Sequence, residues 1–120
     1  MVDGKGKTES KGPAQVELGE IICVPDSASM QATLTVRYTV TLVKTPGFEE
    51  NIFSTHVYIN DVDVGGGTSE STDATRADQV VVTYVWTGSV ACGATYKIKA
   101  KALVTGPFYS DEVDKECGDC

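Results

Sequence analysis

Residues 32–42 read ATLTVRYTVTL, with an apolar side chain at every second position from Ala32 to Leu42. The positions between them hold Arg37 and four threonines. Successive side chains of a strand point to opposite faces of the sheet. This segment therefore predicts a strand with one buried face and one solvated face.

The same alternation recurs along the chain. Breaks containing Gly or Pro separate the segments, and no apolar pattern has helical spacing over the length that a helix needs. About seven short strands predict an all-β domain, either a sandwich or a barrel. We expect a seven-stranded, two-sheet antiparallel sandwich. Its strands are 16–24 with a bend near Gly19, 32–42, 53–59, 62–64 after an Asn60-Asp61 turn, 80–86, 96–104 and 109–115.

The length of 120 residues fits one domain, and the net charge is −7. We expect a flexible N-terminal tail over residues 1–13 and a single β-sandwich domain over 14–120. The acidity argues against binding to nucleic acid or to anionic lipid. No apolar run approaches the roughly 18 residues that a membrane helix needs, so we expect no membrane insertion. The N-terminus carries no hydrophobic signal segment, and we expect an excised piece with an added Met rather than a chain that is not exported.

Residues 90–102 read VACGATYKIKAKA and resemble the second half of a fibronectin type III domain. That family places a Leu, a Pro-Gly turn and a Tyr before an alternating strand. Val90, Cys92-Gly93 and Tyr96 match these positions. The resemblance implies an immunoglobulin-like sandwich in which the Tyr96 hydroxyl bonds back to the chain just upstream.

The resemblance is strongest over residues 90–113 and covers the rest of the chain only by strand count. Residues 105–109 match the loop before the last strand, and Ser110 matches a Ser that opens that strand. The family's core Trp is missing from the segment that holds Tyr38, and the only Trp is Trp86. Bacterial cell-adhesion-related domains are also similar, through the predicted hairpin over 57–64. Both resemblances imply extracellular modules for adhesion or spacing rather than enzymes.

The four cysteines are Cys23, Cys92, Cys117 and Cys120, and they allow three pairings. In the expected topology all of them lie at one pole of the sandwich. We expect two disulfides that tie the C-terminal tail to Cys23 and Cys92, in preference to a local Cys117–Cys120 bridge. Each stabilises the fold by roughly 3–4 kcal/mol, and together they imply an oxidising compartment. A zinc site made of all four cysteines is the alternative.

The sequence predicts no catalytic residue, and we expect that the protein is not an enzyme and binds no cofactor. His56 is the only histidine, and the sequence offers it no partner for acid–base chemistry. The chain has neither a Gly-x-Ser-x-Gly elbow nor a glycine-rich phosphate loop.

A calcium loop is suggested by Asp61, Asp63, Gly66 and Glu70, with Asp73 and Asp78 nearby. The EF-hand pattern also needs an oxygen ligand where this chain has Gly65 and a Glu where it has Thr72. We therefore interpret residues 65–78 as a floppy, glycine-rich polar loop, and whether it binds calcium stays open.

Lys97, Lys99 and Lys101 form a basic stripe on one face of a predicted strand. The stripe is suited to an acidic partner. The alternative is a solvated face in which the lysines pair across strands with Asp111, Glu112 and Asp114.

Two predicted loops place aromatic residues beside Gly/Pro turns, at the pole opposite the cysteines. These residues are Phe48, Phe108 and Tyr109. Loops at one end of a sandwich often bind partners, so the three rings are candidate anchors. The alternative is that they fold back and cap the core.

The sequence thus favours a non-enzymatic extracellular or cell-surface module that binds a protein or glycan, or spaces such a binder. The alternative is a structural subunit of a virion or surface appendage that assembles through strand edges.

Overall fold

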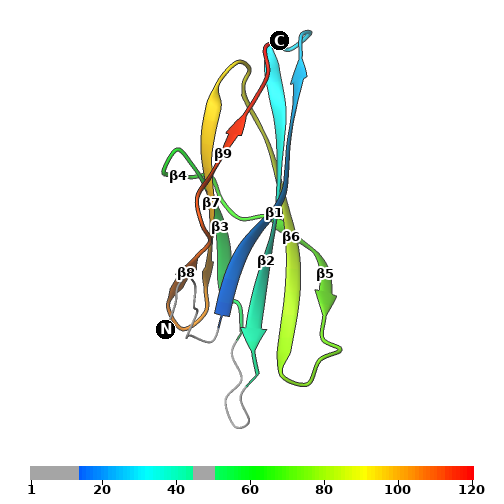
Figure 1. Cartoon of the computed structure of the whole chain (residues 1–120), viewed down its shortest axis with the longest axis vertical. Coiled ribbons are helices and arrows are strands. Elements are labelled where there is room, and N and C mark those ends of the chain that lie inside the picture. Colours follow the sequence, from blue (N-terminus) through cyan, green and yellow to red (C-terminus); the bar gives the residue numbers. More distant parts are fainter. Residues whose placement is uncertain (1–13, 45–50) are drawn as a thin grey trace.

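The computed structural model describes residues 14–44 and 51–120, and these residues form nine strands and no helix (Figure 1). All strand pairs are antiparallel. The strands are β1 (Ala14–Asp26), β2 (Gln31–Val43), β3 (Ser54–Ile59), β4 (Val62–Asp63), β5 (Thr68–Asp73), β6 (Gln79–Ala91), β7 (Thr95–Leu103), β8 (Pro107–Tyr109) and β9 (Val113–Glu116).

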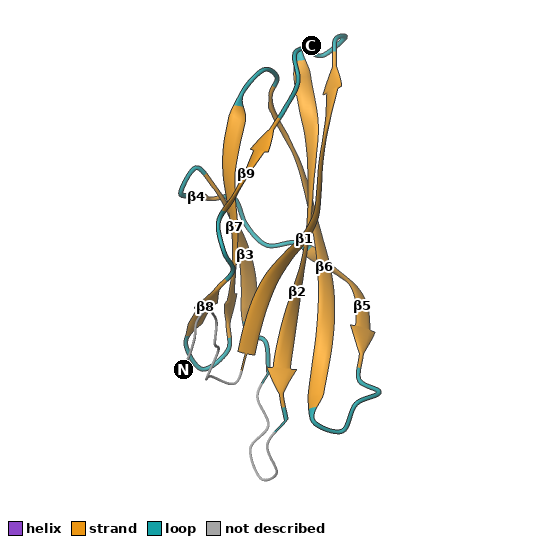
Figure 2. Cartoon of the chain, in the orientation of Figure 1, coloured by secondary structure: helices purple, strands orange, loops and turns teal. Residues whose placement is uncertain are grey.

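The strands form two sheets, as predicted for a sandwich and not for a closed barrel (Figure 2). The first sheet has the order β1-β2-β6-β5. The second has the order β4-β3-β7-β8, and β9 also pairs with β7. This order is compatible with immunoglobulin-like sandwiches, in which strands A, B, E and D face strands C, F and G. β1 runs alongside β7, β8 and β9 and so closes one side of the sandwich.

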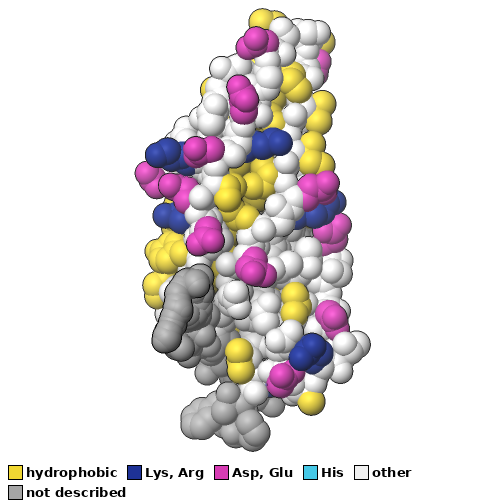
Figure 3. All heavy atoms as spheres, in the orientation of Figure 1, with side chains coloured by type: hydrophobic (Ala, Val, Ile, Leu, Met, Phe, Trp, Pro, Cys, Tyr) yellow, Lys and Arg dark blue, Asp and Glu magenta, His cyan; other side chains and the backbone are white. Residues whose placement is uncertain are grey.

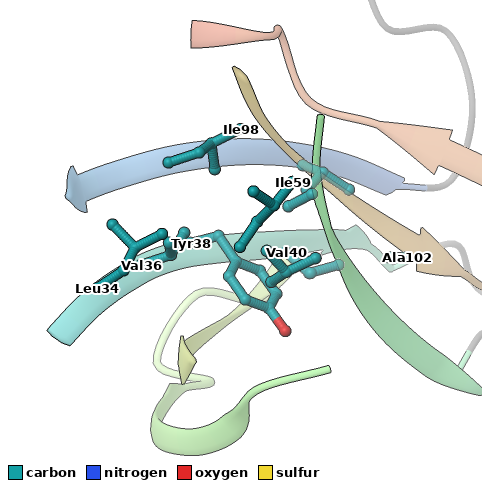
Figure 4. Packing of buried hydrophobic residues seen from close by; sticks show 10 residues of the cluster. Leu34, Val36, Tyr38, Val40, Ile59, Ile98 and Ala102 are labelled. Carbon is teal, nitrogen blue, oxygen red and sulfur yellow. The ribbon is translucent and has the colours of Figure 1, made fainter. Parts of the chain in front are cut away.

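The core lies between the sheets and is built on the alternating residues of β2. Leu34, Val36, Tyr38 and Val40 are fully buried. They meet side chains of β3 and β7, and Figure 4 shows this contact between the two layers. Burial of each large apolar side chain stabilises the fold by about 1.5–3 kcal/mol. The second-sheet members of the core are Val57, Ile59, Ile98, Ala100 and Ala102.

β1 departs from the predicted alternation because it contains a bulge. Its register against β2 shifts between Leu18 and Ile21, at the predicted bend near Gly19. The shift moves the alternation to the other phase, since side chains change face at every residue. Ile22 and Val24, predicted in line with the inward-facing residues, are therefore 39% and 56% exposed.

Residues 65–78 are not the floppy loop that the sequence predicts. They contain β5, which pairs with β6 at the edge of the first sheet. All six side chains of β5 are exposed, so no apolar alternation marked it as a strand. The glycines before it cross tightly between the sheets: the backbone oxygen of Gly65 accepts the Val57 N–H at 2.8 Å, and Gly67 donates its N–H to Tyr38 at 2.7 Å.

The predicted last strand, 109–115, is divided into β8 and β9 by residues 110–112, which begin with the buried Ser110. The Ser110 hydroxyl accepts the Ala100 N–H at 2.9 Å and donates to the Asp111 carbonyl at 2.8 Å. A side chain that takes over backbone bonds interrupts the ladder. β8 in turn begins at Pro107, inside the segment predicted as a loop.

Candidate binding face

All four cysteines lie at one end of the sandwich and form two disulfides. Cys23 is bonded to Cys117 and Cys92 to Cys120, with Cα atoms 5.5 and 5.6 Å apart. This is the arrangement expected from the sequence, in which the C-terminal segment is tied to the end of β1 and to the β6–β7 turn (Figure 1). Two disulfides are typical of an oxidising, extracellular type of environment.

The three candidate anchor rings do not form one cluster in the described residues. Phe48 lies outside them. Phe108 and Tyr109 are neighbours in β8, and their side chains therefore point to opposite faces of the sheet. Phe108 packs against the core, as in the capping alternative. Tyr109 is 51% exposed on the outward face.

Tyr109 belongs to a cluster on the outward face of the second sheet. The cluster comprises Tyr58 of β3, Lys99 and Lys101 of β7, and Tyr109, and we call it the lysine–tyrosine face. The strand register places Tyr58 opposite Lys99, and Tyr109 opposite Lys101.

The two ammonium groups of the lysine–tyrosine face lie between its two rings. Lys99 Nζ is 5.6 Å from the ring centroid of Tyr58 and 5.2 Å from that of Tyr109. For Lys101 Nζ the corresponding distances are 5.9 and 5.8 Å. All four fall within the range of cation–π attraction. Lys101 also donates a hydrogen bond to the Tyr58 hydroxyl at 3.3 Å, and this bond raises the pKa of Lys101.

No carboxylate of the described residues lies within 4.0 Å of either lysine ammonium group, although the charge of Asp63 contributes to the raised pKa of Lys101. The ion pairs within 4.0 Å in the described ranges join Arg37 to Glu20 and Glu70, His56 to Asp63, and Arg76 to Asp78.

The pairing of the lysine stripe with Asp111, Glu112 and Asp114 is therefore not formed at this distance. Asp114 does lie opposite Lys97 in the register, but the other two acids fall in the segment between β8 and β9. Figure 3 shows basic and acidic side chains intermingled along the flank of the second sheet.

His56 has partners that sequence reasoning missed. Its Nε2 lies 3.2 Å from Ser54 Oγ, and its Nδ1 lies 3.1 Å from Asp63 Oδ2. The backbone N–H of Gly65 donates to Asp63 at 2.9 Å, and this bond, with a smaller contribution from His56, lowers the pKa of Asp63. The available signal was the spacing of Ser54 and His56, which puts both on one face of β3. Asp63 arrives through the β3–β4 hairpin.

The order of this hydrogen-bonded chain, Ser–His–Asp, is that of a hydrolase triad. Acyl transfer also needs N–H donors aimed at the developing oxyanion. The backbone N–H of Phe53, next to Ser54, is instead donated to the Leu103 carbonyl at 2.7 Å. The three hydrogen-bonded side chains lie on a half-exposed sheet surface, with side-chain exposures of 27% for His56 and 45% for Asp63.

The residues that suggested a calcium loop are used separately. Asp63 binds His56 and Gly65, Glu70 binds Arg37 on the first sheet, and Asp73 accepts bonds from Thr75. Within residues 14–44 and 51–120, no group of three or more His, Cys, Asp or Glu side chains is arranged to hold a metal ion.

Comparisons with protein-family models, with curated proteins and with solved structures find no match for this chain. No helix among the described residues is long and apolar enough to cross a membrane.

Proposed function

We propose that this chain is a non-enzymatic binding module of an extracellular or cell-surface protein, and that the lysine–tyrosine face is its recognition surface. The observation that carries the proposal is the pair of ammonium groups held between Tyr58 and Tyr109 with no carboxylate within 4.0 Å among the described residues. Tyrosine is enriched in the centres of interfaces because it offers a large rigid contact surface and a polar tip. Lysines beside such rings, with no carboxylate of the described residues within 4.0 Å, suit a negatively charged partner.

The proposed lineage is a divergent fibronectin type III or immunoglobulin-like domain. The Tyr96 hydroxyl donates to the Ala91 carbonyl at 2.7 Å, five residues upstream, as the corner tyrosine of these families does. The strand order supports the same lineage. The extracellular or surface location is supported by the two disulfides.

The Ser54–His56–Asp63 chain favours a structural role over a catalytic one. Its three side chains lie on an open sheet face, and the backbone donor next to Ser54 is already bonded to Leu103. The bond from His56 to Asp63 fixes the β3–β4 hairpin beside the lysine–tyrosine face.

Assembly through strand edges, as in a virion or appendage subunit, has less support. β5, at one edge of the first sheet, has an irregular register around Glu70 and carries the charges of Glu70 and Asp73. β1, at the other edge, is interrupted by its bulge. Bulges and charges on edge strands are devices that oppose edge-to-edge pairing.

The proposed function is tested with an array of immobilised surface proteins and glycans. It is probed with the full chain, with the double variant Lys99→Glu/Lys101→Glu, and with the control Lys44→Glu/Arg76→Glu. The control makes the same change in net charge away from the second sheet. Ligands that bind the wild type and the control, but bind the first variant at least about tenfold more weakly, support the proposal. Ligands that bind all three proteins equally contradict it, provided that circular dichroism shows all three folded.

A further inference from the structure

We infer that the lysine–tyrosine face, extended by Lys97, is a site for an acidic polysaccharide, meaning a glycan chain that carries carboxylate or sulfate groups. The inference rests on the proposed function and adds the chemical class of the ligand. It follows from the spacing of the charges, the pairing of the strand that carries them and the position of the rings.

The three lysines form a row along β7. They occupy alternate positions of the strand, so the Cα atoms of adjacent members are about 6.6 Å apart. A row of this kind matches a linear polymer that repeats a negative charge, more closely than it matches one isolated anion. The polymer lies along β7, and two or three of its charges meet ammonium groups at the same time.

The pairing of β7 favours a polysaccharide over an extended peptide. β7 lies inside the sheet, bonded to β3 on one side and to β8 and β9 on the other. A peptide laid over its face finds no free backbone donors or acceptors, whereas peptides that join a sheet do so at an open edge. The peptide's own N–H and C=O groups then lose water without replacement. Sugar hydroxyls can stay solvated above the face of a sheet.

The two tyrosines flank this row on both sides. Tyr58 stands on β3 and Tyr109 on β8, and both rings contact the ammonium groups of Lys99 and Lys101. Tyrosine presents an apolar ring and a hydroxyl, which suits a sugar with C–H faces and hydroxyl edges. The rings therefore hold the glycan laterally while the lysines hold its charges.

The net charge of the whole chain restricts the attraction of a polyanion to short range at this site. The net charge is −7, so a polyanion is repelled at long range and attracted only at the row of lysines. We expect binding to weaken as salt is added, because the ion pairs are exposed and therefore screened.

The experiment measures binding of the full chain to four immobilised polymers by surface plasmon resonance. Dextran sulfate carries only sulfate, polygalacturonate carries only carboxylate, neutral dextran is the uncharged control, and poly-L-glutamate represents an acidic peptide. The proteins are the wild type, Lys99→Ala/Lys101→Ala, Tyr109→Ala and the control Lys44→Ala/Arg76→Ala.

We expect at least one acidic polysaccharide to bind, neutral dextran not to bind, and poly-L-glutamate to bind about tenfold more weakly. The double lysine variant loses about tenfold in affinity, and the charge-matched control stays within about twofold. Tyr109→Ala, which changes no charge, loses about threefold to tenfold, and this loss separates a built site from simple charge attraction. Comparison of the two charged polysaccharides then decides between sulfate and carboxylate.

Two results overturn the inference. Poly-L-glutamate binding more tightly than both acidic polysaccharides, and losing affinity in the lysine variant, assigns the face to a peptide and leaves the proposed function intact. If no polysaccharide binds, or if binding is equal in the lysine variant and its control, acidic polysaccharides are excluded as ligands of this face. In that case the array decides whether the proposed function survives, since its protein ligands test the same face independently.

Discussion

The buried hydroxyl of Tyr38 lies 2.7 Å from the backbone nitrogen of Gly67 and accepts its N–H. The same oxygen lies 2.7 Å from Thr55 Oγ1. Tyr38 belongs to the first sheet and Thr55 to the second, and Gly67 is part of the segment that crosses between them. One hydroxyl therefore joins both layers of the sandwich to the crossing segment.

Replacing this hydroxyl should destabilise the fold. Tyr38→Phe leaves the Gly67 N–H and the Thr55 hydroxyl without their partner, and we expect the free energy of unfolding to fall by about 1–2 kcal/mol. Tyr58→Phe is the control, since among the described residues its hydroxyl bonds to Lys101 alone, on the outward face of the second sheet, and we expect a change within about 0.5 kcal/mol. Urea denaturation of both variants measures the difference, and equal stability of the two contradicts the role of Tyr38.

Gly67 should not tolerate a side chain. A Cβ built on it lies 2.5 Å from the Val85 carbonyl oxygen and 2.7 Å from the carbonyl carbon, both of which are backbone atoms. We expect Gly67→Ala to lower the free energy of unfolding by about 1–3 kcal/mol through this overlap.

Gly106 provides the matched control for Gly67. A Cβ built on Gly106 meets no atom within 4 Å, and we expect Gly106→Ala to be close to neutral. Thermal unfolding of the two variants side by side checks the pair. If both alanines are neutral, the crossing segment packs less tightly than the structure shows.

The two disulfides should differ in accessibility and in their contribution to stability. Cys117 is 1% exposed, whereas Cys120 is exposed, so we expect Cys92–Cys120 to be reduced first by a mild thiol. The sequence separations are 94 and 28 residues, and loop-closure entropy then assigns about 4.5 kcal/mol to Cys23–Cys117 and about 3.5 kcal/mol to Cys92–Cys120.

Mass spectrometry and paired Cys→Ala variants test these statements. The intact mass of the native chain should lie about four hydrogens below that of the reduced chain, without alkylation. Partial reduction followed by alkylation should label Cys92 and Cys120 before the other pair. Labelling in the reverse order, or four free thiols in the native protein, contradicts the assignment.

Stability at acid pH should depend on Asp63. Its pKa is lowered in the folded state, first by the Gly65 N–H and then by His56. A lowered folded pKa contributes stability that is fully present above the unfolded pKa of about 3.9 and is lost as the pH falls through the folded value. Between about pH 5 and pH 2, Asp63→Asn should therefore lose less of its free energy of unfolding than the wild type does.

His56→Gln separates the two contributions to Asp63. Because the Gly65 bond is the larger cause, this variant should keep most of the acid dependence. Chemical denaturation at several pH values measures both variants. An unchanged pH profile for Asp63→Asn shows that the carboxylate is not stabilised in the fold.

The sequence predicts a strand correctly wherever apolar residues alternate within that strand. β2 and β7 alternate without interruption, and the buried Val36 and Ile98 lie on the faces that the alternation assigns to the core. The prediction of the buried face of β1 is wrong after Gly19, because a bulge shifts the alternation by one residue and leaves no mark in the composition. β5 has no signal at all, since it is held by backbone bonds to β6 and buries none of its side chains.

The lysine–tyrosine face was predictable only in part. The alternation along β7 puts the lysines on one side of a strand, and this much follows from spacing. The approach of Tyr58 and Tyr109 depends on the register of β7 against β8, its neighbour in sequence, and against β3, which is distant in sequence. His56 and Asp63 meet for the same kind of reason, through the β3–β4 hairpin.

The Cys23–Cys117 bond also decides how the sandwich responds to tension. A pull between Ala14 and Cys120 travels along β1 to Cys23, crosses the disulfide and leaves through the last residues of the chain. Residues 24–116, which include eight of the nine strands, lie off this load path. The segments that do carry load are short and their strand part is already extended, so the domain acts as a nearly inextensible link. Force sufficient to strip β1 from β2 still leaves the rest of the chain closed in a covalent loop until the sulfur bond itself is reduced or broken.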